Sequence, residues 1–307
     1  MRDSFTAELS LMVESDPKII LITGDLGFGV FDDFIKRYPN NFINAGVAEQ
    51  NMTGMAAGLA KEGFKVFTYS IGNFATLRCL EQIRNDACYH NLNVNIVSVG
   101  AGFSYGPLGM SHHATEDLAI MRALPNVTVF SPGTKAEAKQ VTRAAIETDN
   151  VSYLRLDKSF AEFDEDEFKL FKASRITNGK DVALISTGGI LSEVLKAQTI
   201  LKEKNIAARV INLHSLKPID TEEILKAASE TKGIITIEEH NIIGGLGSAV
   251  AETCMEGSKK LGFFCRMGLK DEYSYVVGDQ NHLRKVYGIE AKSIVNKALD
   301  LIKNHTS

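Results

Sequence analysis

Short apolar runs alternate along the chain with stretches whose apolar residues recur at helical spacing. The runs predict buried strands, and the stretches between them predict helices that cover the strands. In the first half the strands are expected at Ile19–Thr23, Phe42–Asn44, Lys65–Tyr69, Val94–Val99, Val127–Phe130 and Ser152–Leu156. Helices are expected between them at Val47–Ala60, Thr76–Tyr89, Thr115–Arg122 and Lys135–Glu147. This alternation is typical of an α/β fold, in which helices flank a mostly parallel sheet.

The same alternation resumes in the second half after a charged interruption. Residues 161–171 read AEFDEDEFKLF, where the periodicity fails. We therefore expect a linker at 161–180 between a first domain at 1–160 and a second at 181–307, each a mostly parallel sheet flanked by helices. The second domain is expected to contain the strands VALIST, ARVINL and GIITIEE, helices at Ser192–Lys204, Thr221–Thr231 and Ala291–Ile302, and a further helix that begins within GGLGSAVAE.

Composition removes several classes of protein. The chain has 307 residues, 44% apolar and 23% charged, with a formal net charge of -4. This balance is that of a globular protein, and no basic run marks a nucleic-acid surface. Its longest apolar runs are too short to span a membrane, and the N-terminus MRDSFTAELS lacks an apolar signal core. The four cysteines form no CxxC pair, so we expect free thiols and a cytoplasmic location.

Glu49 stands where a predicted strand gives way to a predicted helix, in INAGVAEQNM. A carboxylate in the first turn of a helix is favoured by the helix dipole, which explains Glu49 without any function. Ligands of α/β proteins bind at the carboxyl ends of strands, which gives Glu49 a second interpretation as a group aimed at a bound heterocycle. The residues alone leave both interpretations open.

His112 and His113 follow a glycine-rich loop, AGFSYGPLGM. Two histidines before a helix are commonly caps or solvated groups, and no third ligand nearby supports a metal site. The loop also suits contact with a polar ligand. A nucleotide site is a weak prediction, because GGLG matches only part of the dinucleotide fingerprint. The residues by themselves thus indicate a candidate site at Glu49 and His112.

Several blocks of sequence, in their order, resemble the transketolase family. GVAEQNM, SIGNFATLRCLEQIRNDA and SHHATEDLAIMRALPNVTVFSP resemble the pyrimidine-binding domain, and LKPID with ITIEEHNIIGGLGSAVAE resembles the C-terminal domain. The family's GDG motif and downstream Asn, which bind the cofactor's diphosphate through Mg²⁺, have no match here. The resemblance therefore implies the second subunit of a split transketolase, which shares thiamine diphosphate with a partner chain that carries the Mg²⁺-binding half. It also implies self-association through the first domain, giving an α2β2 complex.

The resemblance assigns roles to individual residues. Glu49 matches the family glutamate that holds a proton against N1′ of the aminopyrimidine and so promotes removal of the C2 proton. Phe74 is placed to stack on the aminopyrimidine. His112 matches a position near the 4′-amino group and the reacting carbonyl. Arg2 and Lys158 match arginines that bind the substrate phosphate, and His113 is a weaker substrate-binding candidate; these five positions and Glu49 are the predicted site.

Three departures from the family pattern bear on the substrate. Leu108 replaces an aspartate that contacts a substrate hydroxyl, Gly100 replaces a histidine that contacts sugar phosphate, and Lys158 replaces an arginine. A two-carbon ketol transfer to an unusual acceptor is therefore expected. The alternatives are the β subunit of a 2-oxo-acid dehydrogenase decarboxylase, an enzyme like 1-deoxyxylulose-5-phosphate synthase, and an inactive scaffold subunit.

Overall fold

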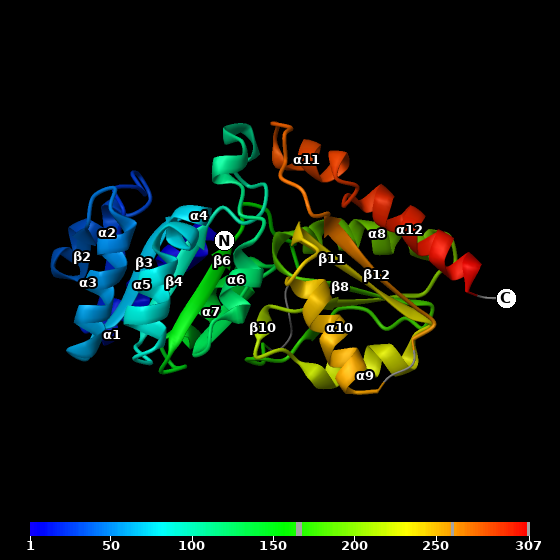
Figure 1. Ribbon diagram of the computed structural model, residues 1–307, viewed down its shortest axis with the longest axis horizontal. Coiled ribbons are helices and arrows are strands. Elements are labelled where there is room, and N and C mark those ends of the chain that lie inside the picture. Colours follow the sequence, from blue (N-terminus) through cyan, green and yellow to red (C-terminus); the bar gives the residue numbers. More distant parts are fainter. Residues whose placement is uncertain (164–167, 259–260, 306–307) are drawn as a thin grey trace.

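The computed structural model describes residues 1–163, 168–258 and 261–305. Two sheets lie side by side along the long axis of the molecule, each flanked by helices (Figure 1). The N-terminus lies near the middle of this view and the C-terminus at one end. The predicted fold class, two mostly parallel sheets flanked by helices, is confirmed.

The first sheet has the strand order β10-β5-β6-β4-β3-β1-β2 among the described residues. Its neighbours pair in parallel except β10, which runs antiparallel to β5. The six strands predicted for the first half are present, shifted by two residues or fewer at their ends. The bounds are β1 (Ile19–Thr23), β2 (Phe42–Asn44), β3 (Lys65–Ile71), β4 (Val94–Val99), β5 (Val127–Phe130), β6 (Val151–Leu156) and β10 (Ser215–Lys217).

Helices cover both faces of the first sheet. The N-terminal helix α1 packs with α7 on one face, and α3 and α6 contribute buried side chains to the other. The bounds are α1 (Arg2–Ser15), α2 (Asp32–Arg37), α3 (Glu49–Lys61), α4 (Gly72–Ala75), α5 (Leu80–Gln82), α6 (Asp117–Ala123) and α7 (Lys135–Ala145).

The prediction of one continuous helix at Thr76–Tyr89 is wrong. The segment is a 3₁₀ turn η2 (Leu77–Cys79), the short α5 and a π-helix η3 (Ile83–Cys88). The amide of Tyr89 donates to the carbonyl of Arg84, five residues earlier. This wider turn lets Ile83, Ala87 and Cys88 all face the core. Ala87 and Cys88 lie four and five residues after Ile83, and a π-helix places all three on the buried side of this segment.

The second sheet has the strand order β12-β11-β8-β9-β7 among the described residues. Its strands are β7 (Ser174–Arg175), β8 (Val182–Ser186), β9 (Ala208–Asn212), β11 (Gly233–Asn241) and β12 (Phe263–Leu269). Its helices are α8 (Leu191–Glu203), α9 (Thr221–Glu230), α10 (Leu246–Glu256), α11 (Gln280–Val286) and α12 (Ala291–Asn304). The sequence pattern did not predict β12 or α11.

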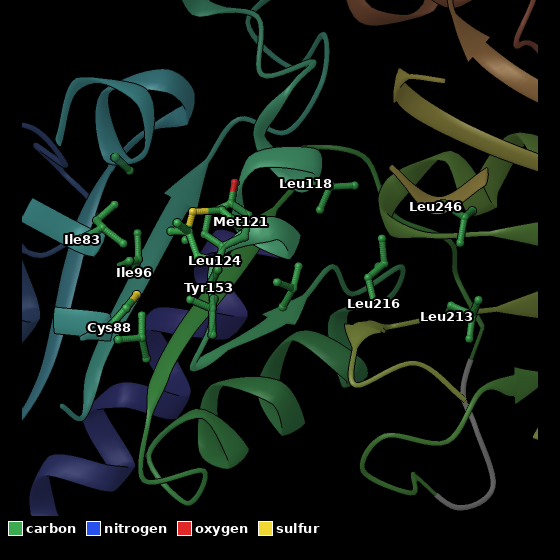
Figure 2. Packing of buried hydrophobic residues seen from close by; sticks show 14 of the residues in the cluster. Ile83, Cys88, Ile96, Leu118, Met121, Leu124, Tyr153, Leu213, Leu216 and Leu246 are labelled. Atoms are coloured by element: carbon green, nitrogen blue, oxygen red, sulfur yellow. The ribbon is translucent and has the colours of Figure 1, made fainter. Parts of the chain in front are cut away.

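The two sheets share a core, and a segment from the second half of the chain joins the first sheet. Residues Ser215–Lys217, from the second half of the sequence, form β10 at the edge of the first sheet. Figure 2 shows Leu216 of this strand between Leu118 and Tyr153 on one side and Leu246 on the other, all within one buried cluster. The expected boundaries between the two domains stay a prediction. Strand β10 belongs to the expected second domain by its sequence position, but it pairs with β5 of the first sheet.

No helix of the described residues is long and apolar enough to cross a bilayer.

A buried ionic network ties the two halves of the chain together. The Arg155 guanidinium on β6 donates to the Asp117 carboxylate and to the carbonyls of Ala114 and Glu239. Arg284 on α11 forms an ion pair with the Glu239 carboxylate. Because both arginines are buried, these charged contacts hold the loop before α6 firmly against the second half.

Candidate functional site

Glu49 is the first residue of α3, just after the carboxyl end of β2. Its side chain is only 2% exposed. The carboxylate does not cap its own helix. Instead, Oε1 accepts a hydrogen bond from Ser70 Oγ at 3.2 Å, and Oε2 accepts one from Arg78 Nη1 at 2.8 Å. These contacts aim the carboxylate across the carboxyl ends of the strands, which a helix-dipole role does not require.

The end of β1 leaves room for this carboxylate. A Cβ placed on Gly24 would lie 3.4 Å from both Cγ and Oε1 of Glu49. That distance is the lower limit of ordinary van der Waals contact, so a methyl group would just fit and a larger side chain at position 24 would press on the carboxylate. The sequence shows Gly24 only as part of GDLGFG, whereas the structure shows that its missing side chain leaves space for the Glu49 carboxylate.

Phe74 lies on the short helix α4, directly after the carboxyl end of β3. Its ring is half-buried, and the Arg78 guanidinium carbon lies 4.3 Å from the ring centroid. This is the geometry of a cation–π contact. Arg78 therefore connects the predicted stacking ring to the Glu49 carboxylate.

His112 ends a 3₁₀ turn, η5 (Met110–His112), after the glycine-rich loop. Its ring meets the Phe74 ring edge to face, with centroids 5.2 Å apart and planes at 73°. His112 Nδ1 lies 3.0 Å from Ser111 Oγ. Although Glu49, Phe74 and His112 come from three distant parts of the sequence, the fold brings them into one cluster at the strand ends.

His113 points away from this cluster. Its side chain is buried, with Nε2 3.2 Å from the Gly106 carbonyl and the ring against Phe103. Burial lowers the pKa of His113. Asn73 Nδ2 donates to the His113 carbonyl at 2.6 Å, which fixes the loop to α4. The structure gives His113 a part in shaping the loop, and its contact with substrate stays a prediction.

Arg2 and Lys158 line the same cavity, of about 560 Å³. Lys135 and Lys139, one helical turn apart on α7, add two more cations to its wall. Burial, with a contribution from the Arg2 charge, lowers the pKa of Lys158. The cavity wall also includes two carboxylates and two aromatic rings, namely Asp3, Asp157, Tyr105 and Phe160. Cations outnumber carboxylates, so the cavity suits an anionic group.

Tyr105 joins this cavity to the cluster around Glu49. Its ring lies 3.8 Å from Lys158 Nζ on one side and 6.5 Å, between centroids, from the His112 ring on the other. Tyr105 thus lies between the His112 ring and the cationic side of the cavity. The site thus has an apolar, carboxylate-bearing end and a cationic end.

Some groups of the site were not predicted from the sequence. Lys135 and Lys139 share a helical face, so spacing could have suggested them. Arg78 lies beyond the break in helical geometry at Thr76, so helical spacing could not have placed it. Ser70 and Tyr105 carry no such signal, because their positions depend on which strand ends lie side by side.

The weakly predicted nucleotide site at GGLG and the buried thiol of Cys79 both have structural explanations. The Glu238 carboxylate accepts from the amides of Leu246 and Gly247, at 2.7 and 2.8 Å, and so occupies the donors that GGLG would offer to a phosphate. Burial raises the pKa of the Cys79 thiol to about 11, so that cysteine is an inert packing group. No group of three or more His, Cys, Asp or Glu side chains that could hold a metal ion is found within the residues described.

Comparison with known proteins covers almost the whole chain. Residues 1–162 match the family "Transketolase, pyrimidine binding domain", and residues 172–294 match "Transketolase, C-terminal domain". The chain is 35% identical to an apulose-4-phosphate transketolase subunit of Phocaeicola vulgatus, over 98% of this chain and 97% of that protein. It is also 35% identical to a 6-deoxy-6-sulfo-D-fructose transketolase subunit of Clostridium sp. strain MSTE9, over 97% and 93% of the two chains.

A solved structure extends the likeness to three dimensions. That protein is described as a split gene transketolase in an inactive β4 tetramer. It is 36% identical to this chain, covers 98% of each chain and gives a TM-score of 0.89. The likeness therefore includes both sheets and the way in which they are joined.

Proposed function

Since the chain belongs to the transketolase family, as its motifs predict, we propose that it is the second subunit of a split, thiamine diphosphate-dependent transketolase. It transfers a two-carbon ketol unit between sugar-type substrates and is active only with a partner chain. The observation that carries this proposal is the buried Glu49 carboxylate, which Arg78 connects to the Phe74 ring, with the His112 ring against Phe74. An inactive scaffold has no need of a carboxylate held out of water at this point.

The residues present fit the aminopyrimidine of the cofactor. Thiamine diphosphate supplies, when bound, the nucleophilic carbon that attacks a substrate carbonyl. Glu49 would hold a proton at N1′, in a position excluded from water and fixed by Ser70. Phe74 offers a half-buried ring for stacking. His112, at the edge of that ring, would donate to the oxygen of the reacting carbonyl.

A partner chain completes the site in this proposal. Two large apolar side chains in the loops that follow β1 and β2 stand exposed: Phe28 is 81% exposed and Val47 is 73% exposed. Exposed apolar side chains at the strand ends are what an interface covers. The covering chain would carry the cofactor's diphosphate and Mg²⁺.

Self-association would bring two copies together through the first domain. A Cβ on Gly54 or Gly58 of α3 would meet no atom within 4 Å, so this helix has an open face suited to close packing with another chain. Two copies and two partner chains would form an α2β2 complex. We expect this complex in the cytoplasm.

An anionic sugar suits the cationic cavity. Arg2, Lys135, Lys139 and Lys158 surround the space that Tyr105 connects to His112. The names of the two relatives specify a phosphorylated and a sulfonated sugar, both anionic. Leu108 is exposed where the family has an acidic residue, so recognition of a substrate hydroxyl there is replaced by an apolar contact.

The test is reconstitution with the partner chain, thiamine diphosphate, Mg²⁺ and a phosphorylated ketose donor. Mass spectrometry should show loss of the donor and gain of two carbons by an aldose acceptor. Calorimetry on the chain alone should show weak cofactor binding, and micromolar binding without a partner would contradict the split-subunit proposal. Release of CO₂ from a 2-oxo acid would instead indicate one of the decarboxylating alternatives, and no turnover with any donor would indicate a scaffold.

A further inference from the structure

Arg78 makes two contacts of different kinds in the candidate site. Its Nη1 donates to Glu49 Oε2 at 2.8 Å, and its guanidinium carbon lies 4.3 Å from the centroid of the Phe74 ring. The side chain is 43% exposed, so solvent lies directly beside it. Arg78 thus reaches inward from the surface to the two groups that the proposed function assigns to the aminopyrimidine.

The chemistry of a guanidinium explains why it can make both contacts at once. It is flat and delocalised, it stacks on aromatic rings, and it donates N–H groups to a carboxylate. A protonated aminopyrimidine is also flat, stacks on an aromatic ring and presents an N–H to a carboxylate. Glu49 Oε2, which accepts a hydrogen bond from Arg78, cannot at the same time accept one from a second planar group that approaches from the same direction.

We propose that Arg78 takes the place of the aminopyrimidine in the cofactor-free subunit, and that cofactor binding displaces it into solvent. This inference rests on the proposed function, because it needs Glu49 and Phe74 to form the aminopyrimidine site. In the free subunit the arrangement keeps the buried Glu49 carboxylate paired. It also weakens cofactor binding, because the apparent affinity equals the intrinsic affinity multiplied by the fraction of time that Arg78 is withdrawn.

Cofactor affinity in the partner-containing complex is the first readout. If Arg78 is docked about nine-tenths of the time, Arg78→Met should lower the Kd for thiamine diphosphate about tenfold. Arg78→Lys keeps the charge and loses the flat group, so its Kd should fall between those of the parent and Arg78→Met. Arg84→Met is the matched control, because Arg84 is an exposed arginine of the same segment whose side chain donates to its neighbour Asn85 and not to Glu49; its Kd should not change. An increased Kd for Arg78→Met would overturn the proposal, since Arg78 would then be a cofactor ligand.

The second readout needs no cofactor. In the cofactor-free chain, ¹H–¹⁵N spectra of arginine side chains should show slowed rotation of the Arg78 guanidinium, which Glu49→Ala abolishes because it removes the acceptor, and which Arg84→Met leaves intact. A freely rotating Arg78 would overturn the proposal whatever the complex binds. A docked Arg78 in a complex that binds no thiamine diphosphate would refute the proposed function, and with it the competition proposed here. The two failures are therefore distinct.

Discussion

Replacing Glu49 with glutamine keeps the size of the side chain and removes its ability to hold and return a proton. In the structure the carboxylate accepts from Ser70 Oγ and from Arg78 Nη1. A glutamine can turn its carbonyl oxygen to Arg78 and donate from its amide to the Ser70 hydroxyl, which also accepts. Both hydrogen bonds therefore survive, and the fold should assemble as before.

The size of each effect follows from these contacts. The hydrogen bond from Arg78 to position 49 loses its charged acceptor in this variant, which should lower the free energy of unfolding. The decrease should be only about 1 kcal/mol, because Arg78 is partly in water. Turnover should fall about a hundredfold or more, the scale for losing a positioned proton-transfer group. That factor corresponds to about 2.7 kcal/mol of transition-state stabilisation. The variant is thus expected to lose far more activity than stability.

The assay measures exchange of the cofactor's C2 proton for deuterium by NMR, in the complex with the partner chain. Glu49→Gln should slow this exchange in parallel with turnover, while the complex still binds cofactor, though less tightly. His112→Ala is the control: it should leave C2 exchange nearly unchanged and impair addition to the carbonyl. If Glu49→Gln exchanged C2 at the parent rate, Glu49 would be only a carboxylate at the start of a helix.

Three further predictions concern assembly, substrate and pH. A Cβ at Gly54 would meet no atom within 4 Å, and Gly54→Leu removes a helix-weakening glycine, so thermal stability should hold or rise by up to about 1 kcal/mol. Light scattering should show loss of the self-dimer, and an intact dimer would contradict the role of this face. Lys158→Met should raise KM for an anionic sugar about tenfold with little change in kcat, whereas the exposed Lys202→Met should not, and an equal rise for a neutral sugar would argue against charge recognition. Burial raises the pKa of Glu238 from 4.5 to about 7, so its contribution to stability is fully present below pH 4.5 and lost as the pH rises through 7. Relative to Glu238→Gln, the parent should therefore lose stability in urea unfolding between pH 5 and pH 8, and a constant difference would refute this.

Elements whose identity depends on local apolar runs could be read from the sequence. Strands β1, β4 and β5 are buried at every position, so β-branched and other apolar residues dominate each of them and their bounds could be predicted. Strand β12 was missed because several of its residues are only half-buried and one is exposed, which breaks the run. Strand β10 has three residues and pairs with a strand far away in the sequence, so no local pattern could indicate it.

The sequence predicted several residues of the site, but not those whose positions depend on the fold. Glu49 and His112 stand out from their loops, and the resemblance to transketolase added Phe74. The position of Arg78 depends on the break after Thr76, where the backbone leaves helical geometry, and an α-helix over this segment would place its side chain differently. The cations of α7 join the cavity only because α1 packs against that helix and brings Arg2 beside them.

Strand β10 has a consequence for how the chain folds. The edge of β5 is covered only once residues beyond 215 have been made, so a chain interrupted at the linker would expose the backbone groups of that edge. An isolated first half would then be prone to pair with other chains through β5. During synthesis the first sheet would stay incomplete until about sixty residues after β6 have been added. If the two halves of this protein are expressed separately, the first half should therefore include the β10 segment.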